Sequence, residues 1–395
     1  MKLFGYSRRM EKKRILILGG GFGGLTLAQE LQPLAKSGKA DVWLLEKSPQ
    51  FQMGLSLQWF LAGRRKREEG LRAYSSLRSK RMTFIPEEAV AIQTAEKLVH
   101  TKSRRIEYDY LIIALGSELA PELVPGLSEA GYNLYDFASV QPFKSALQSV
   151  QTGTVLLAVA SVPFKCPPAP YEYALLIDEI LRKKKVHREV RLALSTPEPQ
   201  PMPVAGLQVG EAVKKMLSDR GVEYLPLHKP KLVEFPNRKM ICENGAEINF
   251  DLLAAVPPHR APKVVREAGL TDDSGFVPAE LGSFRTAAPG VFAIGDAAAL
   301  RLPNGNPHPK AGVFAEAQAL ALASQLTSEL TGQPAAPYSG RGACFVDVGD
   351  GQASPAEAEL LHPEGPRFVL NSPSRAGLLA KKRFETEHLQ RWFSE

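Results

Sequence analysis

The feature that most constrains the fold of this chain is a glycine-rich loop near the N-terminus. It covers residues 19–24, follows the apolar run 14–18 and precedes an amphipathic stretch that ends near Leu34. A second apolar run, 42–45, comes next. This order of apolar run, glycine loop, amphipathic stretch and apolar run is typical of a parallel βαβ unit. It predicts an α/β protein.

The spacing inside this unit predicts dinucleotide binding. Gly19 permits a tight turn, Gly21 lets the backbone approach a pyrophosphate, and Gly24 allows close packing of helix on strand. Glu46 lies 22 residues after Gly24, at the end of the second run, where a carboxylate can accept hydrogen bonds from a ribose. A purely structural glycine turn is the alternative, and the acid in this position disfavours it.

Two later segments resemble the other FAD motifs of the glutathione-reductase-like flavoproteins. One is the apolar run 108–116, which ends at Gly116, and the other is 291–298, which contains Gly295 and Asp296. The resemblance implies that Asp296 binds the ribityl chain of FAD, although a helix N-cap would fit its position equally well. The residues that this resemblance and the glycine loop assign to FAD are Gly19, Gly21, Phe22, Gly24, Glu46, Lys47, Ala89, Gly116, Gly295, Asp296, Lys310 and Gly312.

The FAD motifs are split, which predicts a second unit inserted between them. We expect an FAD-binding domain from 12–116 and 285–337, a second Rossmann-like domain over 117–284, and a C-terminal interface region over 338–395. The second unit shows apolar runs at 154–160 and 189–194 around a helix predicted from about Pro170 to Lys184. It therefore looks like a degenerate repeat of the first unit.

The loop of the second unit has no nicotinamide fingerprint. Residues 161–170 contain no glycine but four prolines, and proline rings both block close backbone approach and remove N–H donors. In the middle of this loop stands Cys166, just before the predicted helix, where the helix dipole would lower the pKa of the thiol. Glu172 follows in the first helical turn, either as a favourable charge there or as an acid/base group.

The chain has three cysteines, too few for a disulfide framework and poorly spaced for a metal, so no metal site is predicted. Cys344 lies 178 residues after Cys166, and this spacing alone does not pair them. Two inert core thiols remain the alternative. Cys242 lies in a predicted hairpin strand and is expected to be structural.

Segment 163–172 resembles the proline-flanked cysteine segment of sulfide:quinone oxidoreductases and of the flavoprotein subunit of flavocytochrome c sulfide dehydrogenase. The segments 51–65, 309–312 and 338–353 are similar to the same enzymes. The resemblance implies that Cys166 and Cys344 form a redox pair beside the flavin. Sulfide would attack their disulfide or a bridging polysulfide, and Cys344 would pass two electrons to FAD. It further implies that Glu172 is the acid/base residue and that Lys310 stabilises the reduced flavin.

The resemblance also has gaps. Many bacterial members carry a third cysteine and a nearby histidine, and residues 117–140 contain neither. The implied function is an FAD-dependent sulfide:quinone-type oxidoreductase acting on sulfide, a small thiol or polysulfide. A flavoprotein with a cytochrome acceptor, a type II NADH:quinone oxidoreductase and a non-catalytic flavin-binding subunit remain alternatives.

The C-terminal stretch 375–393 bears on the electron acceptor. It reads as a basic amphipathic helix with aromatic residues, suited either to a membrane interface or to docking on the protein. Phe345 and Phe384 are the candidates for quinone stacking. The net charge of +7 comes without a nucleic-acid motif, and no run of about 18 apolar residues is present. The Arg8-Arg9 pair lacks the apolar region of an export signal. We therefore expect a cytoplasmic protein, either free or peripheral on the membrane. Whether it forms a homo-oligomer is left open.

Overall fold

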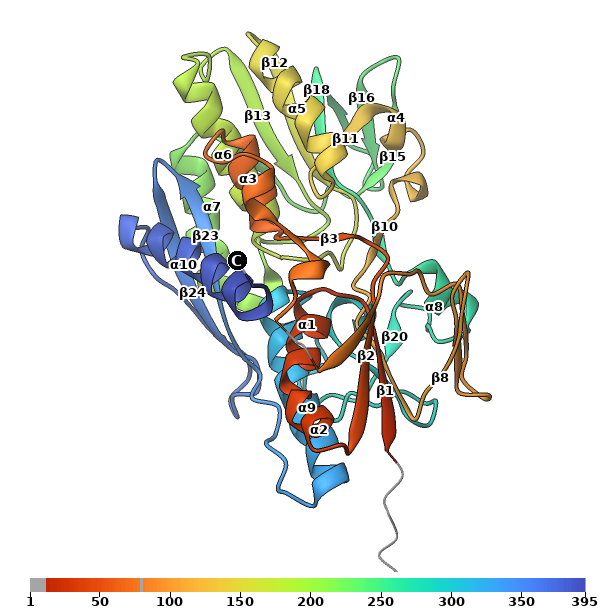
Figure 1. The fold of residues 1–395 in the computed structure, drawn as a ribbon. Coiled ribbons are helices and arrows are strands. Elements are labelled where there is room, and N and C mark those ends of the chain that lie inside the picture. Colours follow the sequence, from red (N-terminus) through yellow and green to blue (C-terminus); the bar gives the residue numbers. More distant parts are fainter. Residues whose placement is uncertain (1–11, 79–80, 395) are drawn as a thin grey trace, which may run out of the picture.

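The computed structural model describes residues 12–78 and 81–394, so the Arg8-Arg9 pair lies outside the described residues. Two parallel five-stranded sheets form the two halves of the molecule (Figure 1). The first has the order β21-β9-β1-β2-β5 and the second the order β11-β18-β12-β13-β14. In both sheets the first strand of the βαβ unit, β1 or β12, lies in the middle. The expectation of an α/β, glutathione-reductase-like fold is confirmed.

The first sheet is built from chain segments far apart in sequence. Its strands are β1 (Lys13–Leu18), β2 (Ala40–Leu45), β5 (Met82–Ile85), β9 (Tyr110–Ile113) and β21 (Val291–Ala293). Ile15 to Leu18 are fully buried, as expected for a parallel strand covered on both faces. The helices of this half are α1 (Phe22–Glu30), α2 (Gln32–Lys36), α8 (Lys263–Glu267) and α9 (Gly312–Thr331). Helices α1 and α9 pack against each other, so both begin at the same edge of the sheet.

The second sheet repeats this arrangement with one continuous segment. Its strands are β11 (Gly131–Asn133), β12 (Gly153–Val159), β13 (Val190–Ser195), β14 (Glu223–Leu225) and β18 (Leu252–Val256), and its helices are α4 (Leu127–Ala130), α5 (Phe137–Ser149), α6 (Ala169–Lys183) and α7 (Leu207–Asp219). Helix α6 matches the predicted helix to within a residue at each end. Its burial is nearly complete from Ala169 to Leu181 because other elements cover it on all sides.

A C-terminal layer connects the two halves. It consists of an antiparallel sheet of β23 (Arg341–Gly349), β24 (Gln352–Glu359) and β25 (Arg367–Leu370), followed by α10 (Arg375–Trp392). Strand β23 packs against α6 of the second half and α9 of the first, and α10 lies on β24. These elements run along one side of the molecule (Figure 1). The predicted domain boundaries themselves stay predictions.

Small elements complete the fold. They are α3 (Leu55–Leu61) and the strands β3 (Gln50–Gln52), β4 (Leu71–Ala73), β6 (Ala91–Gln93), β7 (Leu98–His100), β8 (Arg105–Glu107), β10 (Glu118–Leu119), β15 (Pro230–Glu234), β16 (Lys239–Cys242), β17 (Glu247–Asn249), β19 (His259–Arg260), β20 (Val277–Pro278) and β22 (Ala298–Ala299). Cys242 ends a hairpin strand and is 1% exposed, in the apolar core expected for a structural cysteine. Among the described residues, no helix is both long and apolar enough to cross a bilayer.

Candidate functional site

The glycine loop of the first unit leaves room for a ligand at one position and none at the others. A Cβ atom on Gly24 would lie 1.8 Å from the Gly19 carbonyl oxygen, whereas a Cβ on Gly21 would meet nothing within 4 Å. Gly19 has a φ of 101°, in the region that favours glycine. The loop thus packs tightly on its own strand and exposes the backbone at Gly21, at the N-terminus of α1. This is the geometry that a pyrophosphate requires.

Glu46 holds this loop from the end of β2. Its carboxylate accepts hydrogen bonds from the N–H groups of Gly20 and Ser48, both at 2.8 Å. Each carboxylate oxygen has a further lone pair, so a ribose hydroxyl can also be bound. Beside it opens a cavity of about 460 Å³ whose lining includes Glu46, Lys47, Ala89, Leu115 and Ser117. Lys47 and Ala89, which the sequence assigns to FAD, therefore line the same cavity as Glu46.

Asp296 carries a buried hydrogen-bond acceptor that no described residue satisfies. Its Oδ1 is buried and makes no hydrogen bond to any described residue. Burial raises the pKa of this carboxyl group, and the nearby Lys310 and Lys165 ammonium groups oppose the shift. An orphaned buried acceptor is costly unless a donor reaches it. A ligand hydroxyl, such as one of a ribityl chain, would satisfy it, so the residues present fit FAD.

Lys310 and Gly312 lie beside this carboxylate at the entrance to α9. The Lys310 ammonium donates to the carbonyl oxygens of Asp296, at 2.8 Å, and Ala298, at 2.9 Å. Burial lowers its pKa to about 8, against the effect of Asp296. A Cβ on Gly312 would lie 3.1 Å from the Phe22 ring, so α9 and α1 begin side by side. Gly116 and Gly295 both have a φ of 67° in the turns after β9 and β21.

The proline loop of the second unit is tied to this same region. Cys166 has a φ of 56°, rare for a residue with a side chain, and its N–H donates to the Lys310 carbonyl oxygen at 2.7 Å. The expectation that the helix dipole lowers the pKa of Cys166 is wrong. Burial raises the pKa well above its usual value, and the neighbouring Cys344 and Glu172 raise it further. The dipole of α6 is outweighed because the sulfur is removed from water.

Cys344 comes from the middle of β23, opposite Ala356 of β24. Burial and the Glu172 carboxylate raise the pKa of its thiol to about 11. A charge on Cys344 also raises the pKa of Cys166. The two cysteines, which are 178 residues apart in sequence, therefore lie in one site. Both thiols are free, as is Cys242.

Glu172 anchors a buried polar network next to the two cysteines. Its carboxylate accepts from Gln58 Nε2 at 2.7 Å, from the Asp347 N–H at 2.7 Å and from the ammonium of Lys381. Glu172 and Lys381 are each at most 1% exposed. Although burial opposes it, the Glu172 carboxylate raises the pKa of Lys381. Glu172 is thus held by three hydrogen-bond donors, one of which is a buried ammonium group.

The sequence analysis missed Lys381, Gln58 and Asp347 as parts of this network. Lys381 was counted in a basic run, yet it lies on the same helical face as Leu378, Leu389 and Trp392, which are all buried. A charged residue at such spacing on an apolar face is the signal that could have revealed it. Asp347 carries no such signal, because its burial depends on β23 pairing with β24.

The C-terminal helix is docked on the protein rather than left open. Leu389, Trp392 and Phe393 are at most 4% exposed, and of its apolar residues Leu379 is the one that is mostly exposed. The basic run 64–67 is also internal in part: Arg64 pairs with Glu179 and Asp347, and Arg65 pairs with Glu385. The first two residues of this run therefore do not belong to a solvated face.

Phe345 and Phe384, the two predicted quinone residues, are brought together. Their ring centroids are 6.2 Å apart, and Phe384 also stacks on Phe22 of the glycine loop at 6.1 Å. Phe384 is a half-buried side chain of α10, and Phe345 directly follows Cys344 on β23. An aromatic cluster therefore lies between the start of α1 and the C-terminal layer.

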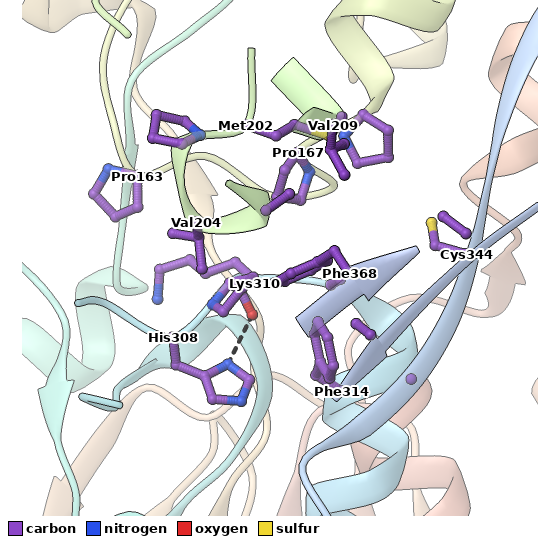
Figure 2. A pocket seen from close by; sticks show the side chains of 18 of the residues that line it. Pro163, Pro167, Met202, Val204, Val209, His308, Lys310, Phe314, Cys344 and Phe368 are labelled. Carbon is purple, nitrogen blue, oxygen red and sulfur yellow. Dashed lines mark hydrogen bonds between the residues drawn. The ribbon is translucent and has the colours of Figure 1, made fainter. Parts of the chain in front are cut away.

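A second cavity, of about 370 Å³, opens beside Cys344 (Figure 2). Proline-rich loops from the second half, the loop before α9 and the strands β23 to β25 surround it. Its lining includes Pro163, Pro167, Glu198, Met202, Val204, His308, Lys310, Phe314, Cys344, Phe345 and Phe368. Its walls are mostly apolar, with Cys344 at one side.

Two family models match this chain. The pyridine nucleotide-disulphide oxidoreductase model matches residues 13–167, and the model of the central part of the sulfide dehydrogenase (flavocytochrome c) flavoprotein chain matches residues 141–257. The second match covers the proline loop and Cys166.

Similar proteins include the mitochondrial sulfide:quinone oxidoreductase of Dictyostelium discoideum, 27% identical, covering 81% of this chain and 72% of that protein. The sulfide-quinone reductase of Aquifex aeolicus is 25% identical over 86% of this chain and 82% of its own. A type II NADH:quinone oxidoreductase of Staphylococcus haemolyticus is 23% identical, covering 86% and 87%. The crystal structure of the Aquifex aeolicus sulfide:quinone oxidoreductase superposes with a TM-score of 0.83 at 24% identity, covering 96% and 91%. The chain is thus an FAD-dependent oxidoreductase with a two-dinucleotide-domain fold, similar to the sulfide:quinone oxidoreductases and the flavocytochrome c sulfide dehydrogenase flavoproteins.

Proposed function

We propose that this protein oxidises sulfide through the Cys166–Cys344 pair and passes the electrons, through FAD, to a quinone. The observation that carries the proposal is the placement of Cys166. It occupies the loop where a second dinucleotide site would need glycines, and a charge on Cys344 raises its pKa. Sulfur chemistry at this position therefore replaces nicotinamide binding. The named relatives that act on sulfide and quinone support the same conclusion.

The reaction begins on the oxidised pair. Hydrosulfide attacks one sulfur of the Cys166–Cys344 disulfide, a new S–S bond forms, and the other cysteine leaves as a thiolate. Burial raises the pKa of both thiols, which means that it destabilises a thiolate released here. Such a thiolate is a strong electron donor. When bound, FAD supplies a two-electron acceptor beside these sulfurs.

The remaining residues hold charge around this centre. Lys310 links the segment that carries Asp296 to the proline loop. Its ammonium donates to the Asp296 carbonyl oxygen, and its own carbonyl oxygen accepts from the Cys166 N–H. We assign it to balance negative charge on the cofactor. Glu172 and Lys381 neutralise each other and fix α6, β23 and α10 around the cysteines. Glu172, which the family resemblance makes an acid/base residue, is in this arrangement a positioning residue.

A quinone is the acceptor that the aromatic cluster favours. The rings of Phe22 and Phe384 are stacked, Phe345 lies edge-on to Phe384, and a planar aromatic head group can stack on such a cluster. Peripheral membrane contact through the exposed face of α10 would deliver the quinone. That face includes Arg375, Leu379, Lys382 and Arg383. A cytochrome acceptor is the second candidate, favoured by the match to the flavocytochrome c flavoprotein model.

The experiment is anaerobic reduction of the FAD-loaded protein, followed by its absorbance. We expect sulfide to bleach the flavin, NADH to leave it oxidised, and a short-chain quinone to restore the colour. Bleaching by NADH would instead assign the protein to the type II NADH:quinone oxidoreductases, to which it is also similar. No bleaching by either reductant would favour a flavin-binding subunit without turnover.

A further inference from the structure

The cavity beside Cys344 contains a carboxylate that the mechanism above does not use. Glu198, in the loop after β13, lines this cavity and is 8% exposed. No lysine, arginine or histidine of the described chain forms an ion pair with it, and burial alone raises its pKa to about 7. A carboxyl group that is buried, without an ion pair and on the lining of the same cavity as a reactive sulfur is unusual enough to require an explanation.

The contacts of Glu198 leave one oxygen free. Oε2 accepts a hydrogen bond from the Tyr171 hydroxyl at 2.6 Å and a longer one from the Thr196 hydroxyl at 3.4 Å. Its main-chain N–H donates to the Thr196 hydroxyl oxygen at 3.2 Å, which fixes the turn. Oε1 receives no hydrogen bond from the described residues. Glu198 is therefore held in place by two hydroxyl groups and can still accept a proton.

The cavity is also larger and less polar than a hydrosulfide site requires. Its volume of about 370 Å³ is bounded mainly by proline, valine and phenylalanine side chains. An anion entering such walls loses its hydration and is repelled by the Glu198 carboxylate, whereas the Lys310 ammonium of the lining is already held by the carbonyl oxygens of Asp296 and Ala298. Neutral hydrogen sulfide meets neither penalty. The uncharged form of the donor is the one that this cavity favours.

Glu172 cannot serve the same purpose. It is ion-paired with Lys381 and accepts two further hydrogen bonds, from Gln58 and the Asp347 N–H. A proton on this carboxylate would break a buried ion pair and leave the Lys381 ammonium buried without its partner. A base is nevertheless required if the donor enters as a neutral molecule.

We propose that neutral hydrogen sulfide enters the cavity beside Cys344 and that Glu198 takes its proton, releasing hydrosulfide inside the cavity that Cys344 lines. The S–H bond breaks, the proton goes to Glu198 Oε1 and the electron pair stays on sulfur, so this step is an acid–base step without electron transfer. The proton then leaves through the mouth of the cavity. This inference rests on the proposed function, because it names the form of the same substrate and its base.

The groups that face Glu198 are few. Tyr171 of α6 and Tyr224 of β14 lie on its own side, and burial raises the pKa of Tyr224 well above its usual value, so both stay neutral near pH 7. Across the cavity are Cys344, His308 and Lys310. Burial lowers the pKa of His308 to about 4, which leaves the ring uncharged. Glu357, at the rim, is exposed. Glu198 is thus the cavity carboxyl expected to titrate close to neutrality.

The test is the pH profile of anaerobic flavin bleaching, with the rate constant expressed per neutral hydrogen sulfide. In the unaltered protein this constant should fall as the pH drops below about 7, because a protonated Glu198 accepts no proton. Glu198→Gln should lose this limb and be slower above pH 7 by about 10²-fold, a typical contribution of a general base. The FAD absorbance of the oxidised variant should be unchanged. Glu211→Gln, at an exposed carboxylate on α7, is the matched control and should keep the whole profile.

A conservative variant separates a proton carrier from a structural residue. Tyr171→Phe removes a hydrogen bond that lowers the pKa of Glu198, so the midpoint of the limb should move to higher pH while bleaching continues. A Glu198→Gln variant that keeps the normal limb and rate would overturn this inference and leave the proposed function intact. Failure of sulfide to bleach even the unaltered protein at any pH would overturn both together. The two failures are therefore distinguishable.

Discussion

The glycine loop after β1 and the proline loop after β12 occupy the same place in two similar parallel sheets, and they differ in almost every backbone property. At Gly21 the first loop leaves open space in front of the N-terminus of α1. In the second loop Pro167 and Pro168 have no N–H, and the N–H of Cys166 is already bonded to Lys310. Anions can be bound by the first loop and not by the second.

This difference shows how one strand-turn-helix frame can serve two kinds of chemistry. The first loop offers backbone donors to a pyrophosphate, whereas the second gives up those donors and presents a cysteine at the same edge of its sheet. The partner Cys344 then comes from a C-terminal layer that packs on both halves. Variants that change one loop at a time test whether the two loops really differ in this way.

The largest effect should come from the first loop. Gly24→Ala places a Cβ about 1.8 Å from the Gly19 carbonyl oxygen, a distance that real contacts never show, so the helix must move away from the strand. We expect a protein that is purified without bound FAD and lacks all flavin-dependent activity. The flavin absorbance of the purified protein, per polypeptide, measures this loss.

Gly54→Ala is the matched control for this change. Gly54 precedes α3, has an ordinary helical φ of −59°, and an added Cβ there meets nothing within 4 Å. It should retain a full complement of FAD. If Gly24→Ala also retained FAD, the tight packing of the first loop would not be required for binding.

The second effect tests the cysteine that faces the proline loop. Cys344→Ser should bind FAD normally but lose sulfide-dependent bleaching by at least about 10²-fold, because serine cannot form or break the S–S bond. Cys242→Ser removes the structural cysteine of β16 and should bleach at the normal rate. Equal rates in both variants would show that Cys166 and Cys344 are inert.

The smallest effect concerns the contact that fixes the proline loop and its helix. Lys381→Met leaves Glu172 buried without its ion partner, which should lower the free energy of unfolding by about 3 kcal/mol. Adding Glu172→Gln to the same protein removes the uncompensated charge and should recover part of the loss. Urea unfolding of the two variants provides the measurement, and an unchanged midpoint in Lys381→Met would mean that the pair contributes no stability.

Much of the fold was predictable because its signals are local. The apolar runs 14–18 and 154–160, the spacing from Gly24 to Glu46 and the helix predicted from about Pro170 to Lys184 all depend on residues close in sequence. These signals predicted the two parallel sheets. The absence of glycine from residues 161–170 likewise indicated that the second unit differs from the first.

The remaining features depend on long-range packing, which a single sequence does not express. The low pKa expected for Cys166 followed from the helix dipole alone, and the opposite direction follows from burial by β23, which is distant in sequence. The pairing of Lys381 with Glu172 joins residues from two ends of the chain. The place of Glu198 in the cavity of Cys344 depends on loops that are distant from one another in sequence.

The account depends most on the claim that the proline loop handles sulfur instead of nicotinamide. The direct measurement is an anaerobic titration of the FAD-loaded protein with sulfide and, separately, with NADH, followed by flavin absorbance. The account predicts full bleaching by sulfide and no change with NADH. Bleaching by NADH together with no response to sulfide would contradict it.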